Sequence, residues 1–366
     1  MSDKVYKGAA IGRTGKGNWG HGLHLGLKNH ERVEVVAVAD EDEEERFAKQ
    51  AELEAPKAYA DWREMLQEEQ PEIVTVGPRW TDCHLEMVLA CLEVGAHVYC
   101  EKPMTWNLAD GDRIVAKVGE VGRKVAVAHQ GAYLPRIQQV KEALAEGRIG
   151  MVQAIYAHGK QDRRGGGEDM MVLGTHLFNI MRLFVGDVEW MSAHITHEGC
   201  ELAVGDVRAA AEPVGPIAGN CVNSYFHFKS GVAGFFDSRK FDEGGGKRMG
   251  MEIVGSDGVI LLRGGGSGPA LLYPHRVFNP EDTGQRWEEL NAVADEPLST
   301  GNDLAIRDLI DAAENEREPI SSAADAVAAL EMILGAYEAQ ITGGRVRFPL
   351  QRQHPLVAWE EGVYGS

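Results

Sequence analysis

The sequence is poor in several features that mark large classes of protein. It has no run of about 18 apolar residues, so we expect no membrane-spanning helix. Its 37 Lys and Arg residues are outnumbered by 56 Asp and Glu residues, which gives a net charge of −19. Nucleic-acid binding needs clustered cationic side chains, so we expect no nucleic-acid partner. The five cysteines are odd in number and form no C-x-x-C pair, which favours reduced thiols in a cytoplasmic protein and no metal site.

The length of the chain predicts two domains. A chain of 366 residues suits two domains of ordinary size, and it contains neither an internal repeat nor a low-complexity linker. Residues 1–7 are polar and lead directly into a strand-like run, which is unlike a secretory signal. We therefore expect a cytoplasmic protein made of two globular parts.

A glycine-rich turn follows the first apolar run. Residues 12–20 contain the pattern Gly15-x-Gly17-x-x-Gly20, and a helix-like stretch comes next. Glycine allows tight turns and a close approach of the backbone to a pyrophosphate, while N–H groups at a helix start face phosphate oxygens. A second apolar run ends at Asp40, twenty residues after Gly20, which is the spacing of an acid that binds the adenosine ribose. This order predicts a dinucleotide site; a loop that the glycines merely cap is the alternative.

The acid at position 40 also favours one cofactor over the other. The carboxylate of Asp40 accepts a hydrogen bond from a ribose 2′-hydroxyl but repels a 2′-phosphate, and the five acidic residues 41–45 add to that repulsion. The same acidic run suits the solvated first turn of a helix. We therefore expect NAD as the cofactor and NADP to be disfavoured.

Polar side chains follow the later strands of the N-terminal half. Strand-like runs such as 73–76 and helix-like stretches such as 61–69 and 108–121 alternate up to residue 128, which predicts a doubly wound parallel sheet. Lys102, in Glu101-Lys102-Pro103, directly follows the apolar run 97–100. Ligands bind beyond the carboxyl ends of such strands. The expected cofactor-binding residues are Gly12, Arg13, Thr14, Gly15, Gly17, Asn18, Trp19, Gly20, Asp40, Pro78, Arg79, Trp80, His84, Glu101 and Lys102.

The pattern changes in the C-terminal half. Several short strand-like runs, among them 152–158 and 221–228, and glycine-rich turns predict an α+β domain with an open, mainly antiparallel sheet. We place the dinucleotide-binding domain at residues 1–128 and the substrate-binding and oligomerisation domain at residues 129–366. A predicted helix over 172–184 bears His176. The candidates for substrate binding are Tyr133, Arg136, Gln161, Arg163, Thr175 and Asn179.

With these segments the chain resembles the glucose–fructose oxidoreductase / inositol dehydrogenase family, often called Gfo/Idh/MocA. The similar segments are the glycine loop, residues 36–40, Gly95-x-His97-Val98-x-Cys100-Glu101-Lys102-Pro103, Leu173-Gly174-x-His176 and Gly255-Ser256-x-Gly258. The resemblance implies a Rossmann domain beside an α/β domain with an open sheet. It also implies an NAD(P)-dependent reaction on a sugar, cyclitol or polyol, and homodimers or homotetramers. It gives Lys102 the place of the catalytic lysine and His176 that of the catalytic histidine.

The chain departs from this family at two positions near the histidine. Val172 and Asn179 stand where members often carry aspartate. A carboxylate there would fix the tautomer of an imidazole and raise its basicity, which neither residue does. The proton transfer therefore falls more heavily on Lys102, or the substrate differs from the common sugars of the family.

The expected reaction is oxidation of a secondary alcohol, with hydride transfer to C4 of the nicotinamide. Lys102 acts as general acid/base with assistance from His176, because burial and a nearby nicotinamide cation both favour the neutral amine. Two alternatives stay open. One is a hidden-redox glycosidase or lyase that uses NAD without net redox change, and the other is a non-catalytic NAD-binding regulatory protein. An arginine pair, Arg163 and Arg164, could grip a carboxylate or phosphate, or could pair with Glu168 or Asp169.

Overall fold

The computed structural model describes two compact units. It covers residues 4–241, 248–264, 268–279, 281–282, 284–290 and 296–364. The first unit consists of Met1–Gln130, Glu212–Gly215 and Ser299–Val327, and the second consists of Gly131–Ala211, Pro216–Leu298 and Ala328–Ser366. Among the described residues, no helix combines the length and the apolar character needed to cross a bilayer.

The first unit is built on a parallel sheet of six strands. Their order is β3-β2-β1-β4-β5-β6, so the direction in which the sheet grows reverses between β1 and β4. All residues of β4 and β5 are buried, which explains their continuous apolar runs. The predicted doubly wound sheet is confirmed. The strands are β1 (Tyr6–Ile11), β2 (Val33–Ala39), β3 (Lys57–Tyr59), β4 (Ile73–Val76), β5 (His97–Cys100) and β6 (Val125–Val127).

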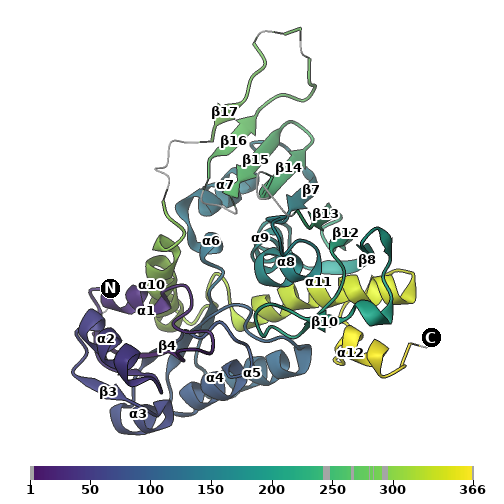
Figure 1. The fold of residues 1–366 in the computed structure, drawn as a ribbon. Coiled ribbons are helices and arrows are strands. Elements are labelled where there is room, and N and C mark those ends of the chain that lie inside the picture. The colour runs from purple at the N-terminus through teal and green to yellow at the C-terminus, as the bar shows by residue number, and fades with distance from the viewer. Residues whose placement is uncertain are drawn as a thin grey trace. The chain divides into compact units, whose positions relative to one another are not determined.

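Helices accompany this sheet along the chain (Figure 1). Three of them begin at a side-chain cap: the side chains of Asp42, Asp61 and Asn107 each accept a hydrogen bond from a backbone N–H in the first helical turn. These caps explain why the predicted helix boundaries lie close to the observed ones. The helices are α1 (Leu23–Lys28), α2 (Glu43–Leu53), α3 (Trp62–Glu69), α4 (His84–Glu93), α5 (Leu108–Val121) and α10 (Thr300–Glu314).

Helix α10 returns to the first unit from far along the sequence. Its Asn302 accepts a hydrogen bond from the Tyr99 hydroxyl at 2.9 Å and donates one to the His21 carbonyl at 3.0 Å. A Cβ atom on Gly26 would lie 2.8 Å from the Asn302 carbonyl oxygen, so only glycine lets α1 approach α10 this closely. The chain therefore needs this late helix to hold the segment that follows the glycine loop.

The second unit contains one large, mainly antiparallel sheet, as predicted. Its order is β17-β16-β15-β14-β7-β13-β12-β8-β18, with β9 paired to β8. β7 and β13 are parallel neighbours, and they end close together. The strands are β7 (Val152–His158), β8 (Val188–His197), β9 (Cys200–Glu201), β12 (Cys221–Phe228), β13 (Ala233–Arg239), β14 (Gly250–Gly255), β15 (Val259–Arg263), β16 (Ala270–Tyr273), β17 (Glu288–Glu289) and β18 (Val346–Arg347); β10 (Arg208–Ala209) and β11 (Pro216–Ile217) form a separate pair.

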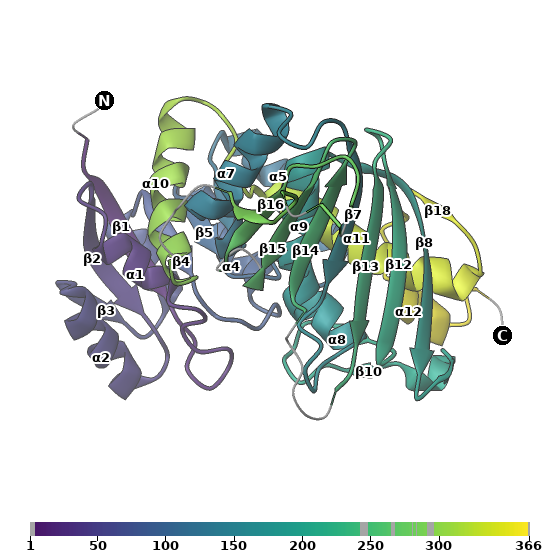
Figure 2. The ribbon, with the colours of Figure 1, turned by 90° about the horizontal axis from the view of Figure 1, so that it is seen from above.

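Helices lie on one face of this sheet (Figure 2). The buried residues of β12 alternate with partly exposed ones, which is the pattern of a sheet covered on one side. On the more exposed face Tyr156 stacks on Phe235, and Trp190 packs against Tyr225. The helices are α6 (Gln130–Tyr133), α7 (Pro135–Ala145), α8 (Gly167–Asp169), α9 (Thr175–Val185), α11 (Ala323–Thr342) and α12 (Pro355–Glu360), with the 3₁₀ turn η2 at Val204–Asp206.

The helix that carries His176 differs from the predicted one at its start. The prediction begins a regular helix at Val172, whereas residues Met170–Gly174 form a π-helical segment, η1, that leads from α8 into α9. The π segment makes α8, η1 and α9 one helical run from residue 167 to residue 185. Val172 lies buried in that segment.

Candidate functional site

The glycine-rich loop folds into a small hairpin. Arg13 and Asn18 exchange backbone hydrogen bonds of 3.0 and 3.1 Å, which close the hairpin. Gly17 and Gly20 have φ angles of 93° and 58°, a region that side chains disfavour. A Cβ atom on Gly20 would also lie 2.2 Å from the Gly77 carbonyl oxygen. The hairpin therefore packs directly against the residues that follow β4.

Asp40 holds the tip of this hairpin from the end of β2. Its buried carboxylate accepts hydrogen bonds from the Thr14 amide at 3.1 Å, the Thr14 hydroxyl at 2.8 Å and the Asp42 amide at 3.0 Å. Arg13, at the base of the hairpin, pairs with Asp82 at 2.9 Å. The acid predicted to meet the ribose thus also positions the loop predicted to meet the phosphates.

Glu101 ties the glycine loop to the end of β5. Its carboxylate is fully buried and accepts hydrogen bonds from the His21 amide at 2.7 Å and from the Lys102 amide at 2.8 Å, and it lies 2.6 Å from Nδ1 of His21. Burial by itself raises the pKa of Glu101, but the hydrogen bonds and charge of His21, with Lys102, outweigh burial and hold the pKa below its usual range. Lys102, 4% exposed, follows directly.

His84 holds the segments that follow β4 and β5. Its side chain is fully buried, and Nε2 lies 2.6 Å from the Pro78 carbonyl oxygen. Nδ1 lies 3.1 Å from the Pro103 carbonyl oxygen and 3.0 Å from that of Met104. The Lys102–Pro103 peptide is cis. One ring nitrogen therefore faces carbonyls just after Lys102 and the other faces the carbonyl of Pro78, which makes His84 a positioning residue.

The remaining predicted cofactor residues lie at the same strand ends. Arg79 and Trp80 are half-buried, and Arg79 lies 3.6 Å from Glu212. Trp19 is buried against Gly12, where a Cβ atom would lie 2.2 Å from the indole ring. Two further residues of this region were not predicted. His21 follows Gly20 and contacts Glu101, and Lys16 is exposed at the hairpin tip.

In the second unit, several of the predicted substrate-binding residues lie on helices, as His176 does. Tyr133 ends α6, Arg136 lies in the first turn of α7, and both are buried. Thr175, His176 and Asn179 lie on α9 and are 3%, 7% and 3% exposed. Within the described part of the chain, the side-chain oxygen of Asn179 has no hydrogen-bond partner. This buried amide therefore keeps an acceptor that no described residue uses.

Gln161 joins two buried or half-buried carboxylates. Its backbone has a left-handed φ of 58°, and its amide donates to Asp169 at 3.0 Å. Its side chain donates to Asp237 at 2.6 Å, and His158 contacts the same carboxylate. Burial raises the pKa of Asp169, with the charge of Asp162 in the same direction, whereas the hydrogen bond from Ser238 opposes it. Gln161 is thus a structural link between β7, β13 and α8.

Arginine pairing in the following loop differs from the predicted pairing with Glu168 or Asp169. Arg164 pairs with Asp162 at 2.7 Å and lowers the pKa of that carboxyl well below its usual range. Glu168 accepts from the Ala211 amide at 3.1 Å and lies 3.5 Å from Arg208. Arg163 is exposed and makes no ion pair within the described residues. The two arginines therefore do not pair with Glu168 or Asp169.

The described residues contain no group of three or more His, Cys, Asp or Glu side chains that could hold a metal ion. The five cysteines are free, and three of them, Cys83, Cys91 and Cys100, are buried. Burial raises the pKa of each of these three thiols, which disfavours the reactive thiolate.

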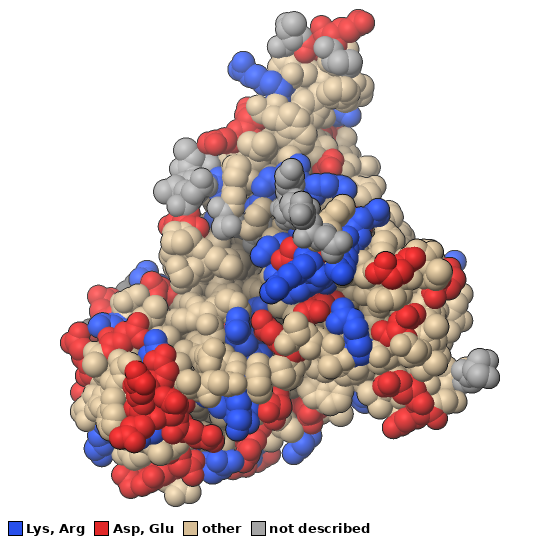
Figure 3. All heavy atoms as spheres, in the orientation of Figure 1, with Lys and Arg blue, Asp and Glu red and all other residues tan. Residues whose placement is uncertain are grey.

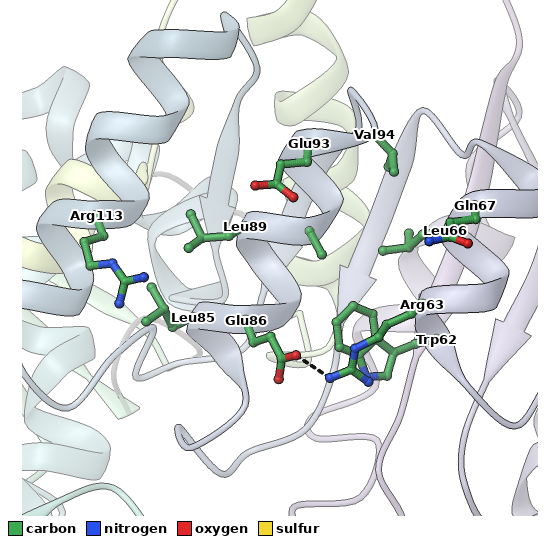
Figure 4. Close-up of a pocket in the computed structure, with 11 residues that line it drawn as sticks. Trp62, Arg63, Leu66, Gln67, Leu85, Glu86, Leu89, Glu93, Val94 and Arg113 are labelled. Carbon is green, nitrogen blue, oxygen red and sulfur yellow. Dashed lines mark hydrogen bonds and ion pairs between the residues drawn. The ribbon is translucent and has the colours of Figure 1, made fainter.

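A groove on the helices of the first unit is separate from this site (Figure 4). It has a volume of about 470 Å³ and lies between α3 and α4, with Arg113 of α5 at one side. The Arg63 guanidinium lies over the Trp62 ring, 4.1 Å from its centroid, and contacts Glu86. None of the residues predicted to bind cofactor or substrate lines the groove.

Comparison with known proteins identifies the family. A family model described as the oxidoreductase family with an NAD-binding Rossmann fold matches residues 10–129, and the model of its C-terminal alpha/beta domain matches residues 141–348. Myo-inositol 2-dehydrogenase of Thermotoga maritima is 27% identical over 260 residues, which cover 69% of this chain and 74% of that protein. D-apiose dehydrogenase of Paraburkholderia graminis is 29% identical over 56% of each chain, so this match spans about half of either protein.

A solved structure shows the same fold. Levoglucosan dehydrogenase in complex with NADH and levoglucosan has a TM-score of 0.77 and 15% identity, with 95% of this chain and 100% of that chain covered. The two family models together span most of the sequence. The folds that they describe agree with the sheets observed in the two units. The chain therefore belongs to the Gfo/Idh/MocA family of NAD(P)-dependent oxidoreductases, as the resemblance of its motifs implied.

Proposed function

We propose that the chain oxidises a secondary alcohol of a sugar, cyclitol or related polyol and transfers the hydride to C4 of the nicotinamide of NAD. The observation that carries this proposal is the placement of Lys102. It is buried at the end of β5, beside a Glu101 carboxylate that also binds the glycine loop. A proton-transfer group is thereby fixed to the loop that receives the cofactor. The dehydrogenases of inositol and apiose among the relatives support a polyol substrate.

The first unit fits a dinucleotide. The exposed hairpin tip around Gly15 leaves open space beside the backbone, where a Cβ atom would meet nothing within 4 Å. When bound there, the nicotinamide supplies the hydride acceptor. Asp40 accepts from the ribose while holding Thr14, and Glu41 and Asp42 add negative charge that disfavours a 2′-phosphate. The cofactor is therefore NAD rather than NADP.

The proton leaves the substrate through polar side chains of the chain itself. Lys102 takes the hydroxyl proton, and His176 hydrogen-bonds the reacting oxygen. Asn179 offers its free oxygen to a neighbouring hydroxyl of the substrate. Neither Asn179 nor Val172 supplies the carboxylate that is common at these positions in the family. The other candidates for contacts with the substrate are Tyr133, Arg136, Gln161, Arg163 and Thr175.

The exposed aromatic face of the large sheet serves assembly. Tyr156 and Phe235 stack at 4.6 Å, and Trp190 lies 5.2 Å from Tyr225, on a face that no helix of the second unit covers in Figure 2. A row of aromatic side chains that are exposed or partly exposed marks a contact surface. The chain therefore forms a homodimer or homotetramer through this face, and light scattering of Phe235→Glu beside the wild type tests it. A wild-type monomer at micromolar concentration contradicts it.

The test of the reaction follows NADH absorbance with NAD and a panel of sugars, cyclitols and sugar acids. We compare wild type, Lys102→Ala and the control Lys117→Ala, which removes a partly exposed lysine of α5 that pairs with Glu120. We expect Lys102→Ala to lower kcat by about 10²- to 10⁴-fold while NAD still binds, and Lys117→Ala to have no effect. Sugar consumption without NADH would favour the hidden-redox reaction. NAD binding without turnover of any substrate would favour a regulatory protein.

A further inference from the structure

Cationic side chains gather at one place in the second unit. β7 and β13 run parallel and end at His158 and Arg239, and β14 begins at Gly250, opposite His158. The described residues of the segments that meet there include six cations, which we call the cationic cluster: Lys160, Arg163, Arg164, Arg239, Lys240 and Arg248. Figure 3 shows Lys and Arg side chains massed on this unit, whereas acidic side chains dominate the first unit around α2. Such a concentration is unexpected in a chain with a net charge of −19.

Backbone contacts hold the segments of the cluster together. The Phe241 amide donates to the Asp162 carbonyl at 3.3 Å, and the Gly165 amide donates to the same oxygen at 2.9 Å. A Cβ atom on Gly165 would lie 2.1 Å from the Arg239 carbonyl oxygen, so the loop can pass this strand end only with glycine there. Arg248 reaches His158 at 3.1 Å. The cations therefore belong to one fixed surface and their fields add.

Among the residues that the structure describes, the carboxylates near the cluster are paired or buried. Asp162 pairs with Arg164 at 2.7 Å and with Lys160 at 3.5 Å. Asp237 is bound by His158 and Gln161, and Asp169 is fully buried. In contrast, Arg163 and Arg239 are exposed, and neither makes an ion pair in the part of the chain that the structure describes. Their guanidinium groups remain available to an external anion.

The cluster is coupled to the helix that carries His176. The Gln161 amide, within the cationic loop, donates to the Asp169 carboxylate at 3.0 Å. Asp169 precedes His176 by seven residues in one helical run whose middle part is the π segment η1, so the two residues lie about two helical turns apart. This separation suits a substrate that reacts at one end near His176 and carries its charge at the other.

We propose that the cationic cluster binds an anionic group of the substrate, so that the enzyme prefers a sugar acid or a sugar phosphate to the corresponding neutral sugar. This inference rests on the proposed function for the redox reaction and adds the charge of the substrate. The guanidinium forks of Arg163 and Arg239 match both carboxylate and phosphate, since each offers two parallel N–H donors.

The test compares three probes that differ at one carbon: a hexose, the hexuronate and the hexose 6-phosphate. Each is assayed with NAD and, independently of turnover, by calorimetric binding. The proteins are the wild type, Arg163→Gln, Arg239→Gln and their double variant. Arg113→Gln is the matched control, because it removes an exposed arginine from α5 of the first unit. Thermal melting confirms that each variant is folded.

We expect the wild type to bind one anionic probe at least tenfold more tightly than the hexose, and the double variant to lose about tenfold to a hundredfold of that preference. A preference for the hexuronate identifies a carboxylate, and one for the 6-phosphate identifies a phosphoryl group. A merely structural role would lower binding of all three probes together. Equal binding of hexose and both anions, or equal preference in wild type and double variant, overturns the proposal. Anion binding without turnover keeps the cluster and rejects the proposed reaction.

Discussion

The site in the first unit and the site in the second unit use charge in opposite ways. In the first unit, the charged side chains bind groups of the protein itself: Asp40 holds Thr14, Arg13 holds Asp82, and Glu101 holds the glycine loop. In the second unit, exposed arginines such as Arg163 and Arg239 form no ion pair within the described residues. The first arrangement shapes a backbone surface, and the second leaves side chains free for a ligand.

This difference follows from what each ligand part demands. A pyrophosphate is recognised by backbone N–H groups, so the charged side chains of the protein serve to hold the loop in shape. A variable substrate is recognised by side chains at loop positions on a rigid scaffold. Substitutions should therefore change stability and cofactor binding in the first unit, but substrate preference in the second.

The largest effect should come from Glu101→Gln. The amide group of glutamine would face the N–H groups of His21 or Lys102, so one buried donor loses its acceptor and the buried negative charge beside His21 and Lys102 is lost. We expect a loss of about 3–5 kcal/mol in the free energy of unfolding. Urea titration measures it, with Arg239→Gln as the second-unit counterpart, expected within about 0.5 kcal/mol of wild type. Equal losses in both variants would abolish the contrast between the two sites.

Acid should expose a second property of the first unit. Burial, with the nearby charges of Arg123 and Lys4, lowers the pKa of His97 from 6.5 to about 4. The unfolded chain binds a proton at His97 below pH 6.5, whereas the folded chain does so only near pH 4. The free energy of unfolding therefore falls as the pH falls through this window, by about 3 kcal/mol from this residue.

The check is a set of urea titrations between about pH 7 and pH 4, the window in which the folded and unfolded chains differ in protonation. His97→Gln should flatten the decline of stability with pH, because glutamine does not bind a proton in this range. Glutamine can still accept the hydrogen bond from the Lys124 amide. In the second unit, burial alone lowers the pKa of His354 to about 4, so His354→Gln should flatten the curve in the same way. A variant curve parallel to the wild type would show that the imidazole is protonated in the folded chain as well.

Much of the first unit could be predicted because its signals are local. Glycine spacing, a strand-end acid and apolar runs lie within short stretches, and the predicted strand 73–76 and helix 108–121 agree with β4 and α5. The hairpin within residues 12–20 was not predicted, since it depends on the bond between Arg13 and Asn18. No local pattern predicts that α10 packs in the first unit. Its Asn302 contacts Tyr99, which lies 203 positions earlier in the sequence.

For the second unit, the sequence predicts the fold class but not which strands pair. The alternating pattern identifies an open sheet, and the predicted strands 152–158 and 221–228 agree with β7 and β12. The cationic cluster could not be predicted because Arg163 and Arg239 become neighbours only when β7 pairs with β13. Strand pairing between distant segments is set by the whole core, which a local reading of sequence does not contain.

A smaller effect should separate two glycines of the hairpin. Gly15 and Gly20 both have positive φ angles, 76° and 58°, so alanine costs about 1–2 kcal/mol of backbone strain at either position. Only Gly20 of these two lies against another segment, because a Cβ atom there would lie 2.2 Å from the Gly77 oxygen. Gly20→Ala should therefore be the less stable variant and should bind NAD about tenfold more weakly, as calorimetry would show. Equal NAD affinity in the two variants would mean that the packing against the end of β4 does not shape the site.

The smallest effect is expected in the groove of Figure 4, which shares charged side chains with neither site. Arg63→Gln removes a cation–π contact to Trp62 and an ion pair with Glu86, whose side chain is 64% exposed. Solvent screens such pairs, so we expect a loss of about 1 kcal/mol or less, which roughly 1 M salt should reduce further. NAD affinity and substrate preference should not change. If either did, the groove would be coupled to the strand ends through α4, and the separation between a self-paired cofactor site and an exposed substrate site would no longer explain where substitutions act.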